Sequence, residues 1–452
     1  MPKHFLLSLL TAAALMAALP ARADEPFRDH RYDSWKVMTL PKDAIVFAGN
    51  SITDMHNWTE AFGNDPRIVN RGNSGGYSHE MLQTAETWAR FKPAKVFIKI
   101  GTNDLGTGYT PEMVAGNVQR TVDIIRAESR KTEIYIQSIL PARDQQNRTP
   151  ATTQATNELL RKIAEHTPRT TYIDLYSRLG GILQGAPYSL DNLHMEALGY
   201  RIWCEALEPY LGGIKCIYPA NTEQRQDTGG LGYSHGMRAT YFSMQPVGHD
   251  DVLFFGDEMV KNGEWNELLH NPHVLNRGSH WGYGGDIACT SRFVDAAFAN
   301  RDIVMREDPK QVLLYTGTAD LNGKTPLEDI ETQYKALIEK VRREAPTSKI
   351  ALVSLMPTMW PNDRIPAFNK WLRETAAADA SLSYIDIYTP LATPNGAANP
   401  AYFKANYIYG LGYAVISEVL ARHIDGCTPL TLHQARKNKA DYERRAAKWL
   451  EN

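Results

Sequence analysis

The amino-acid sequence predicts an α/β fold made of two tandem units, each a three-layer sandwich in which helices cover both faces of a mainly parallel, five-stranded sheet. Three observations support this prediction. The chain has 452 residues, of which 43% are hydrophobic, so it can bury two or three domain cores. Short apolar runs alternate with longer helical patterns. The same series of motifs also occurs twice along the chain.

The strands of the first unit are expected where apolar residues run continuously, because a parallel sheet covered on both faces buries both sides of each strand. These runs lie near residues 44–48, 67–70, 95–100, 133–138 and 171–174. Helical segments such as 110–129 and 152–165 lie between them. Ligands of such sheets bind at the carboxyl ends of the strands, so the residues directly after each strand are the candidate functional residues.

Six motifs recur in the same order, and they indicate an internal duplication. The matched segments are 44–51 with 251–258, 68–72 with 274–278, 96–104 with 312–320, 138–141 with 354–357, 172–174 with 384–386, and 199–200 with 412–413. A unit of about 190 residues is too long for a solenoid repeat. The resulting domains are a signal peptide (1–23), a catalytic domain (24–218), a linker (219–236), a second domain (237–427) and a charged C-terminal helix (428–452).

The first 23 residues resemble a secretory signal peptide. Lys3 gives a positive start, residues 5–19 are an apolar run, and the small residues Ala21 and Ala23 fit a cleavage site. No later segment approaches about 18 consecutive apolar residues, the length that a membrane-spanning helix needs. We therefore expect an exported protein, periplasmic or secreted, that does not insert into a membrane.

Charge and cysteine content restrict the function classes further. Lys and Arg number 49 against 51 Asp and Glu, which argues against a protein that binds nucleic acid by neutralising phosphates. Cys204 and Cys216 are the cysteine pair most suited to a local disulfide, although they and the other two, Cys289 and Cys427, also fit buried thiols. The chain has no Cys-x-x-Cys or His-Glu-x-x-His motif, so no metal site or cofactor is predicted.

Four polar blocks in the first unit carry the predicted chemistry. They are Gly49-Asn50-Ser51-Ile52-Thr53, Asn70-Arg71-Gly72-Asn73-Ser74-Gly75-Gly76, Gly101-Thr102-Asn103-Asp104 and Asp191-Asn192-Leu193-His194. Each block alone also fits a helix N-cap, a tight turn or an exposed Asp–His pair. Together they provide a nucleophile, a base, an acid that orients the base, and oxyanion donors. This combination predicts an acyl-transfer site.

The four blocks resemble those of the SGNH branch of the GDSL hydrolases, whose platelet-activating-factor acetylhydrolase-like and carbohydrate-esterase members have a similar layout. The resemblance covers roughly residues 40–215. Asn50 stands where the family motif has Asp, and Asn keeps the same hydrogen-bonding shape. The resemblance implies flavodoxin-like units and a catalytic triad of Ser51, His194 and Asp191. It also implies an oxyanion hole formed by the backbone N–H groups of Ser51 and Gly75 and the side-chain amide of Asn103.

The second unit has different residues at the aligned positions. Glu258 aligns with Ser51, Trp281 with Gly75, Ala319 with Asn103, Lys404 with Asp191, and Tyr407 with His194. We therefore predict that the second unit is non-catalytic. It shapes or covers the first site, binds glycan, or only stabilises the fold. The aromatic residues considered for glycan binding also fit core positions; they are Trp265, Trp281, Tyr283 and Trp360.

Polar and aromatic loop residues near the predicted site favour a short acyl group on a polar alcohol. They are His56, Asn57, Asn73, Ser74, Tyr77, Arg143, Gln145 and Asn147. The resemblance points to removal of acetyl groups from sugars, with sialic acid or polysaccharide acetates as substrates. Arg143 fits either a partner for a substrate carboxylate or a surface arginine. A lipid or thioester hydrolase and an inactive glycan-binding protein remain as alternatives. The expected partner is a small-molecule or glycan ester.

Overall fold

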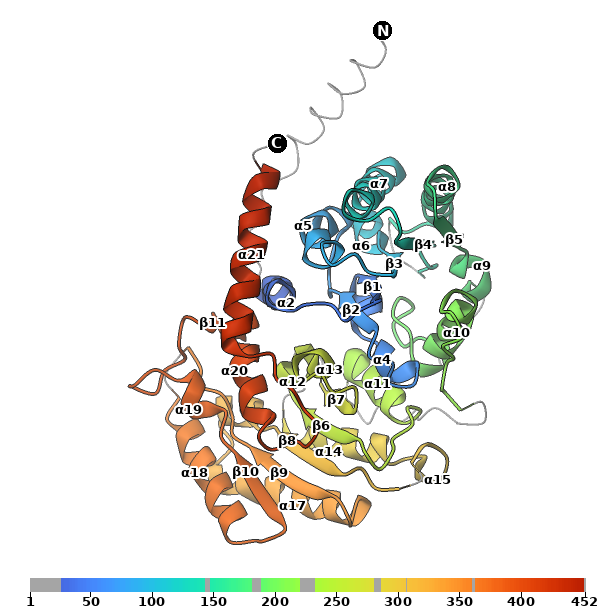
Figure 1. Ribbon diagram of the computed structural model, residues 1–452. Helices are drawn as coiled ribbons and strands as arrows, with labels where there is room; N and C mark the ends of the chain where they lie inside the picture. The colour runs from blue at the N-terminus through green and yellow to red at the C-terminus, as the bar shows by residue number, and fades with distance from the viewer. Residues whose placement is uncertain are drawn as a thin grey trace, which may run out of the picture.

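A computed structural model of the chain describes residues 26–142, 147–180, 188–219, 232–279, 286–305, 307–359 and 362–450 (Figure 1). It contains two five-stranded sheets and one short two-stranded sheet. The strands of each large sheet pair in parallel throughout. The predicted fold class, two tandem α/β units, is confirmed. The predicted signal peptide lies outside the described residues.

The first unit has the strand order β2-β1-β3-β4-β5, which is the flavodoxin-like order. Its strands are β1 (Ile45–Gly49), β2 (Ile68–Gly72), β3 (Lys95–Lys99), β4 (Glu133–Gln137) and β5 (Thr170–Ile173). Its helices are α2 (Pro26–Val37), α3 (Ser51–Asp54), α4 (Trp58–Ala61), α5 (Ser78–Ala89), α6 (Thr102–Gly106), α7 (Pro111–Glu128), α8 (Pro150–His166), α9 (Leu175–Leu179), α10 (Ala197–Leu207) and the 3-10 helix η1 (Glu208–Tyr210).

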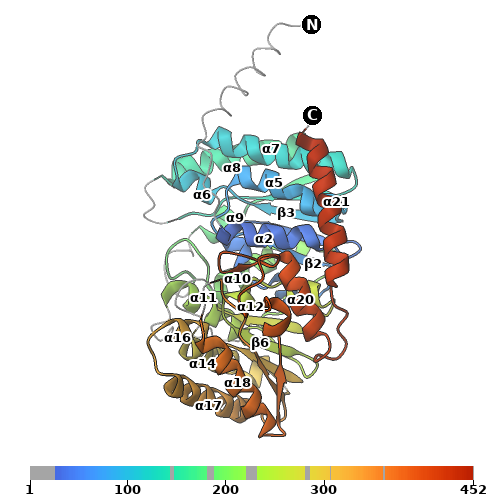
Figure 2. The ribbon, with the colours of Figure 1, turned by 90° about the vertical axis from the view of Figure 1, so that its left-hand side faces the viewer.

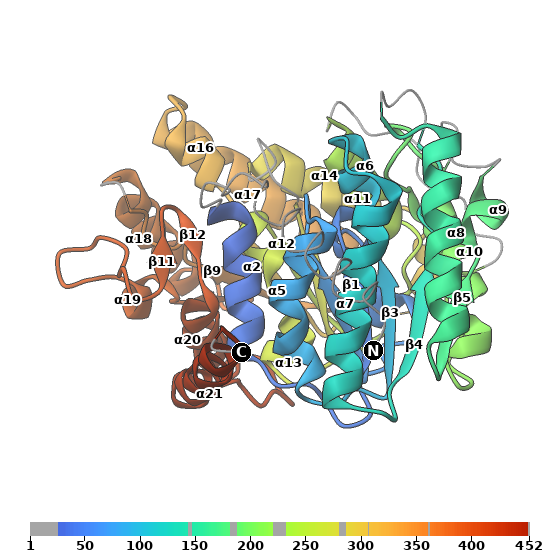
Figure 3. The same ribbon diagram turned by 90° about the horizontal axis from the view of Figure 1, so that it is seen from above.

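Helix α7 shows how the sequence forms the outer layer of this unit. Thr110 caps it by accepting a hydrogen bond from the amide of Met113, and Pro111 follows at the first helical position. Its buried residues, among them Val114, Val118 and Val122, recur every four positions and so lie on one face. Seen from above, α5, α7 and α8 lie side by side over the sheet (Figure 3).

The second unit repeats this arrangement with the order β10-β9-β8-β6-β7. Its strands are β6 (Val252–Gly256), β7 (Val274–Gly278), β8 (Gln311–Tyr315), β9 (Lys349–Val353) and β10 (Leu382–Ile385), with β11 (Phe403–Lys404) and β12 (Tyr407–Ile408) as a separate hairpin. Its helices are α11 (Gly232–Phe242), α12 (Glu258–Asn262), α13 (Trp265–Leu268), α14 (Ile287–Ala297), α15 (Arg301–Val304), α16 (Thr318–Asn322), α17 (Leu327–Glu344), α18 (Arg364–Ala377), α19 (Tyr388–Leu391), α20 (Gly410–Leu420) and α21 (Leu432–Leu450).

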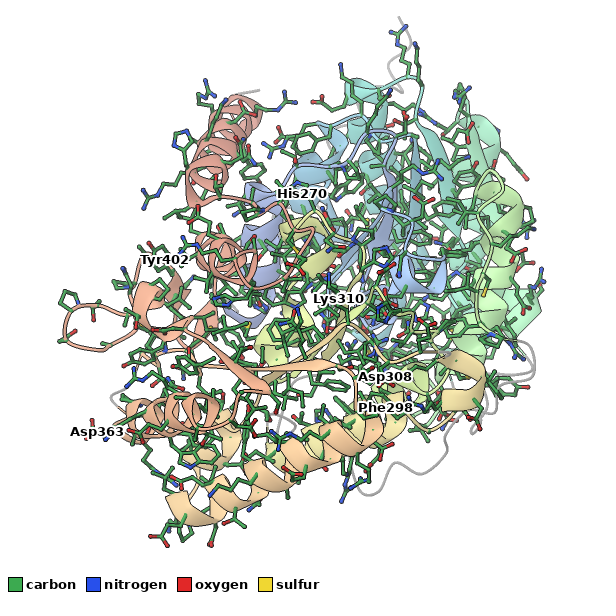
Figure 4. The ribbon with its side chains drawn as sticks, turned by 60° about the horizontal axis from the view of Figure 1, so that its bottom comes forward. His270, Phe298, Asp308, Lys310, Asp363 and Tyr402 are labelled. Atoms are coloured by element: carbon green, nitrogen blue, oxygen red, sulfur yellow. The ribbon has the colours of Figure 1, made fainter. Side chains whose placement is uncertain are left out.

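In Figure 4, which brings the bottom of the molecule forward, Asp363, just before α18, lies at the left edge of the second unit, and Lys310, just before β8, lies nearer the middle. Helix α11 begins at Gly232, inside the range 219–236 that the sequence assigns to a linker. Turn-forming residues around 228–236 made this segment look irregular, but α11 packs between the units and is stabilised by that packing. Residues 220–231 lie outside the described residues.

The two units share one continuous core. A single buried cluster joins Phe47 and Trp203 of the first unit to Tyr241 and Phe254 of the second. Two helices also cross the boundary between the units. Helix α2 packs on α20, and α21 runs along both units (Figures 1 and 2). The C-terminal helix is therefore part of the contact between the units.

Candidate active site

Ser51 is the first residue of α3 and directly follows the loop at the end of β1. Asn50 caps this helix, because its side-chain oxygen accepts a hydrogen bond of 3.1 Å from the amide of Ile52. The aligned Asp257 caps α12 in the same way, with 2.9 Å to the amide of Met259. Asn and Asp are therefore interchangeable in this capping role. Gly49 is needed next to them, because a Cβ there would lie 2.5 Å from the carbonyl oxygen of Lys99.

Ser51, His194 and Asp191 lie in a hydrogen-bonded chain. The Ser51 Oγ is 2.8 Å from the Nε2 of His194, and the Nδ1 of His194 is 2.6 Å from the Oδ2 of Asp191. The Oδ1 of Asp191 accepts from the amides of Leu193 and His194, at 3.0 and 2.7 Å. Asn192 has a φ of +60°, which Asn tolerates, and this turn brings the carboxylate under the ring. The sequence-predicted residues therefore meet.

Asp191 remains a carboxylate at neutral pH. Burial raises its pKa, but the hydrogen bonds and charge of His194 and the two amides lower it more, and the net pKa is below its ordinary value. An ionised Asp191 accepts from the Nδ1–H of His194, which leaves Nε2 as the ring nitrogen that can take the proton of the Ser51 hydroxyl. The geometry therefore suits proton transfer from Ser51 to His194.

The loop after β2 lies beside the end of β1, where the amide of Asn73 donates to the carbonyl oxygen of Gly49 at 3.0 Å, and Gly75 is held in it from two sides. Gly75 has a φ of +74°, a conformation that favours glycine. Its carbonyl oxygen accepts a 2.8 Å hydrogen bond from Arg28 of α2, and Asn73 donates to the carbonyl oxygen of Arg28 at 3.3 Å. On the other side, the Ser74 hydroxyl donates to the Oδ2 of Asp54. The backbone at Gly75 is therefore held in one conformation.

Asn103 lies in the first turn of α6 and bridges the second and third blocks. Its Nδ2 donates to the carbonyl oxygen of Gly76 at 3.0 Å. Gly101, which precedes α6, has a φ of +116°, and a Cβ there would lie 2.7 Å from Ile139. Asp104 accepts hydrogen bonds from the amide and hydroxyl of Ser78. The three segments that carry Ser51, Gly75 and Asn103 thus converge at the carboxyl ends of β1, β2 and β3.

The second unit has the same backbone frame without these side chains. Glu258 opens α12 as Ser51 opens α3, and burial raises its pKa to about 7. Gly317 has a φ of +114°, like Gly101, and is followed by Thr318 and Ala319. Trp281, which the sequence aligns with Gly75, lies outside the described residues.

The hairpin of the second unit differs from the histidine loop. The Tyr407 ring stacks on the ring of His30 of α2, with centroids 5.2 Å apart, and the Lys404 ammonium lies 3.7 Å from the Asp29 carboxylate. Residues of α2 therefore contact the positions that align with His194 and Asp191.

Several sequence-predicted loop residues lie elsewhere. The buried His56 ring stacks on Tyr200 at 4.1 Å, and the Asn57 amide donates to the carbonyl oxygen of Asn276 in the second unit at 3.1 Å. Both line a polar cavity between the units. Trp265 is 1% exposed and donates to a backbone carbonyl, so it is a core residue. The sequence around His56 and Asn57 suggested a loop near the site, but packing between the units buries His56 and half-buries Asn57.

Of the other loop residues predicted near the site, some form structural contacts and some lie outside the described residues. Asn73 and Ser74 are buried and occupied in holding the Gly75 loop. The Asn147 side chain donates to the carbonyl oxygen of Gly106 at 3.2 Å. The positions outside the described residues are Arg143, Gln145, Tyr283 and Trp360.

Sequence reasoning missed the residues that support the site from a distance. Arg28 precedes the first strand, and Lys261 and Tyr241 belong to the second unit, so no motif of the first unit includes them. Lys261 Nζ lies 2.7 Å from Asp54. One available signal was the repeat itself, because Asp54 and Lys261 are aligned positions with opposite charge.

The four cysteines are free thiols in this structure. Cys204 and Cys216, the pair predicted to suit a local disulfide, are nevertheless neighbours. The Cys204 thiol forms a hydrogen bond with Cys216 and lowers the pKa of Cys216. Among the described residues, no cluster of three or more His, Cys, Asp or Glu side chains could hold a metal ion. No described helix is both long and apolar enough to cross a membrane.

Comparisons with known proteins identify the family of the chain. A model of the GDSL-like Lipase/Acylhydrolase family matches residues 47–202 and again residues 255–407. Rat platelet-activating factor acetylhydrolase IB subunit alpha2 is 28% identical over 179 residues, which cover 38% of this chain and 74% of the rat protein.

Two similar solved structures each match part of the chain. A platelet activating factor protein from Streptococcus pneumonia is 22% identical with a TM-score of 0.38, covering 46% of this chain and 100% of its own. A carbohydrate esterase family 3 protein from Talaromyces cellulolyticus is 18% identical with a TM-score of 0.32, covering 37% and 96%. The family match spans both units and more than half of the sequence. The chain therefore belongs to the GDSL-like lipase/acylhydrolase family of esterase-type hydrolases.

Proposed function

We propose that the first unit is a serine esterase that removes short acyl groups, most simply acetyl, from a polar alcohol such as an O-acetylated sugar. The observation that carries this proposal is the hydrogen-bonded chain from Ser51 through His194 to Asp191 at the carboxyl edge of the sheet. The family supplies the reaction class, ester hydrolysis. The acyl group and the alcohol are inferred from the surroundings of the site.

The reaction proceeds in two acyl-transfer steps. In the first, the Ser51 Oγ attacks the ester carbonyl carbon while its proton moves to the Nε2 of His194. The tetrahedral adduct collapses, the bond to the alcohol oxygen breaks, and the proton on His194 passes to that oxygen. In the second, water attacks the acyl-Ser51 carbonyl carbon while His194 takes one of its protons. This adduct collapses, the bond from the carbonyl carbon to Ser51 Oγ breaks, the proton on His194 returns to Oγ, and the carboxylic acid leaves. Asp191 keeps the ring oriented and stabilises the imidazolium.

The oxyanion of each adduct is stabilised by three donors. We assign them to the backbone N–H groups of Ser51 and Gly75 and to the side-chain amide of Asn103. The N–H of Ser51 lies at the positive end of α3, and Asn103 is held next to the Gly75 loop by its bond to Gly76. Donors that are held in place before the substrate binds are the ones that lower the barrier most.

A polar substrate is favoured over a lipid by the side chains around the site. The segments next to Ser51 present the half-buried side chains of Tyr77 and Asn103. Among the described residues, Ile303 is the only exposed large hydrophobic side chain, at 47%, and it belongs to α15 of the second unit. A lipid-binding surface would need a contiguous apolar patch of a few hundred Å². We extend the proposal to an exported enzyme, periplasmic or secreted, on the basis of residues 1–23.

The test is an acetate-release screen. The purified protein is incubated with acetylated sialic acids, acetylated polysaccharides, aryl acetates and aryl esters of increasing chain length, with S51A as the blank. We expect the highest kcat/KM on acetylated sugars and a steady fall as the acyl chain lengthens. A preference for long chains would replace the proposal with a lipid or thioester hydrolase. No turnover, together with no labelling of Ser51 by a serine-directed phosphonate, would leave a binding protein.

A further inference from the structure

The two units contact each other through matching elements, so each contact recurs with the units exchanged. Arg71 of β2 pairs with Glu267, with 2.6 Å between their charged atoms. The aligned Arg277 of β7 pairs with Glu60 at 2.7 Å. The two arginines occupy the same register position of their strands, and the two glutamates occupy the same turn of the short helix that precedes each strand. The second unit therefore lies against the face of the first that carries α3 and α4 (Figure 1).

One pair of aligned positions contacts each other across the boundary between the units, and its two residues have opposite charges. Asp54 ends α3, and the aligned Lys261 of α12 reaches it with 2.7 Å between Nζ and Oδ2. Both side chains are 2% exposed or less. Asp54 also accepts from the hydroxyl of Ser74, which precedes Gly75. A charge of the second unit is thus connected through Asp54 to the loop that carries a proposed oxyanion donor.

Helix α11 of the second unit reaches the histidine loop directly. The hydroxyl of Tyr241 donates to the carbonyl oxygen of Met195 at 2.9 Å. The Oγ1 of Thr240 accepts from the amide of Ala197 at 3.0 Å. These two backbone groups flank the turn that follows His194, and both side chains from α11 are fully buried. Arg238 of the same helix donates to the carbonyl oxygen of Met55, just after α3, at 3.2 Å.

These contacts reach all three segments that carry the proposed mechanism: the helix of the nucleophile, the loop of the oxyanion donor Gly75 and the loop of the catalytic histidine. We propose that the second unit is a positioning scaffold for the esterase site of the first, and that Tyr241 and Lys261 are its positioning residues. This inference rests on the proposed function, because the positions it maintains are those of the proposed triad and oxyanion hole. Neither residue touches the reacting atoms.

A purely stabilising role predicts a different result from a positioning role. Backbone shifts of about 1 Å at a catalytic group can cost about a hundredfold in rate while the protein stays folded. A scaffold that acts on the site therefore changes kcat more than KM. A contact that only stabilises the fold lowers the melting temperature and leaves the kcat of the folded fraction unchanged.

The first experiment compares two matched tyrosine variants. Y241F removes the hydroxyl that donates to Met195, and the control Y334F removes an equally buried hydroxyl that donates to the carbonyl oxygen of Leu314 within the second unit at 3.1 Å. We expect Y241F to lower kcat on an aryl acetate about three- to tenfold with KM nearly unchanged, the range of one lost hydrogen bond. Y334F should keep the wild-type kcat. Equal kcat in both variants would overturn the assignment of Tyr241.

Hydrogen exchange provides a readout that does not require turnover. In Y241F, the amides of the segment 191–197 should exchange faster than in the wild-type protein and in Y334F. Unchanged exchange in that segment would contradict the positioning role. Failure of the wild-type protein to cleave any ester is a separate result, which refutes the proposed function and is recorded before the variants are compared.

The second experiment is a double-mutant cycle across the boundary between the units. K261M and S74A are measured alone and together, and K340M, which removes a half-buried lysine paired with Asp295 within the second unit at 2.8 Å, is the control. We expect about a tenfold loss of kcat in K261M, none in K340M, and no further loss when K261M is combined with S74A, because both act through Asp54. Losses that multiply in the double variant would refute the connection between Lys261 and the oxyanion loop.

Discussion

Lys99 gives a prediction whose size follows from its surroundings. It ends β3 on the face that packs against α10, it is 2% exposed, and its Nζ lies 5.4 Å from the centre of the Trp203 ring. No carboxylate among the described residues forms an ion pair with it. Burial lowers its pKa from 10.5 to about 7. The variant K99M keeps the length of the side chain and removes the charge.

The lowered pKa determines both the sign and the size of the effect. Because the neutral amine is favoured in the folded state, the unfolded chain binds more protons between pH 7 and 10.5, and the contribution of this group to stability rises with pH across that window. Lowering the pKa from 10.5 to about 7 means that burying the protonated amine destabilises the folded state by roughly 5 kcal/mol at low pH. Relaxation and loss of the ring contact reduce the gain from K99M to about 2–4 kcal/mol near pH 7.

Thermal and urea unfolding between pH 6 and 10 provide the assay. K99M should unfold at a higher temperature than the wild-type protein near pH 7, and this advantage should shrink toward pH 10. The control K335M removes a lysine that also faces a tryptophan, Trp371 at 5.8 Å, but from an exposed position, and it should change stability little. A K99M protein that is less stable at pH 7, or whose advantage is independent of pH, would refute the reasoning.

Four further predictions concern the chemistry and the thiols. S51A should abolish acetyl-ester cleavage and keep the wild-type circular dichroism spectrum; comparable activity would remove Ser51 from its role. N103A should lower kcat about 10²–10³-fold in steady-state assays if the amide is an oxyanion donor, and a loss below fivefold would argue against it. E258A should leave turnover largely unchanged, whereas a loss above tenfold would mean that the second unit contributes chemistry. Oxidised glutathione should couple Cys204 to Cys216, detected as a loss of two hydrogens by mass spectrometry, and persistence of both thiols would exclude that pair.

The sequence predicted the sheet and its edge because those features are local. Continuous apolar runs give the strands, and the polar blocks after them give the positions of Ser51, Gly75 and Asn103. The 191–194 turn was also predictable, because three residues separate the acid from the imidazole and Asn192 accepts a positive φ. In each case the relevant physical constraint acts within a few residues of the side chain.

The remaining features depend on packing between distant segments, and motif reasoning did not find them. His56 and Asn57 stand in a polar loop, and the second unit covers that loop. Trp265 fitted either glycan binding or a core position in the sequence, and the structure shows the core position, with its ring packed against Phe254 and the ring centroids 4.9 Å apart. A single sequence gives the composition of such a segment and not the partner that buries it.

The internal duplication carries information of a kind that a single motif lacks. Positions that keep the same charge in both copies, such as Arg71 with Arg277 and Glu60 with Glu267, are the ones that pair across the boundary. Where two aligned residues contact each other across the boundary, they cannot both have the same charge, because two like charges in a buried contact repel each other.

Asp54 in the first copy and Lys261 in the second replace that repulsion by an attraction, which requires that the two copies differ in sequence at this position. The same freedom allowed the second copy to replace Ser51 by Glu258 while its packing residues stayed. Under the proposed positioning role, a unit without the catalytic side chains and with the contact residues retained is the expected combination.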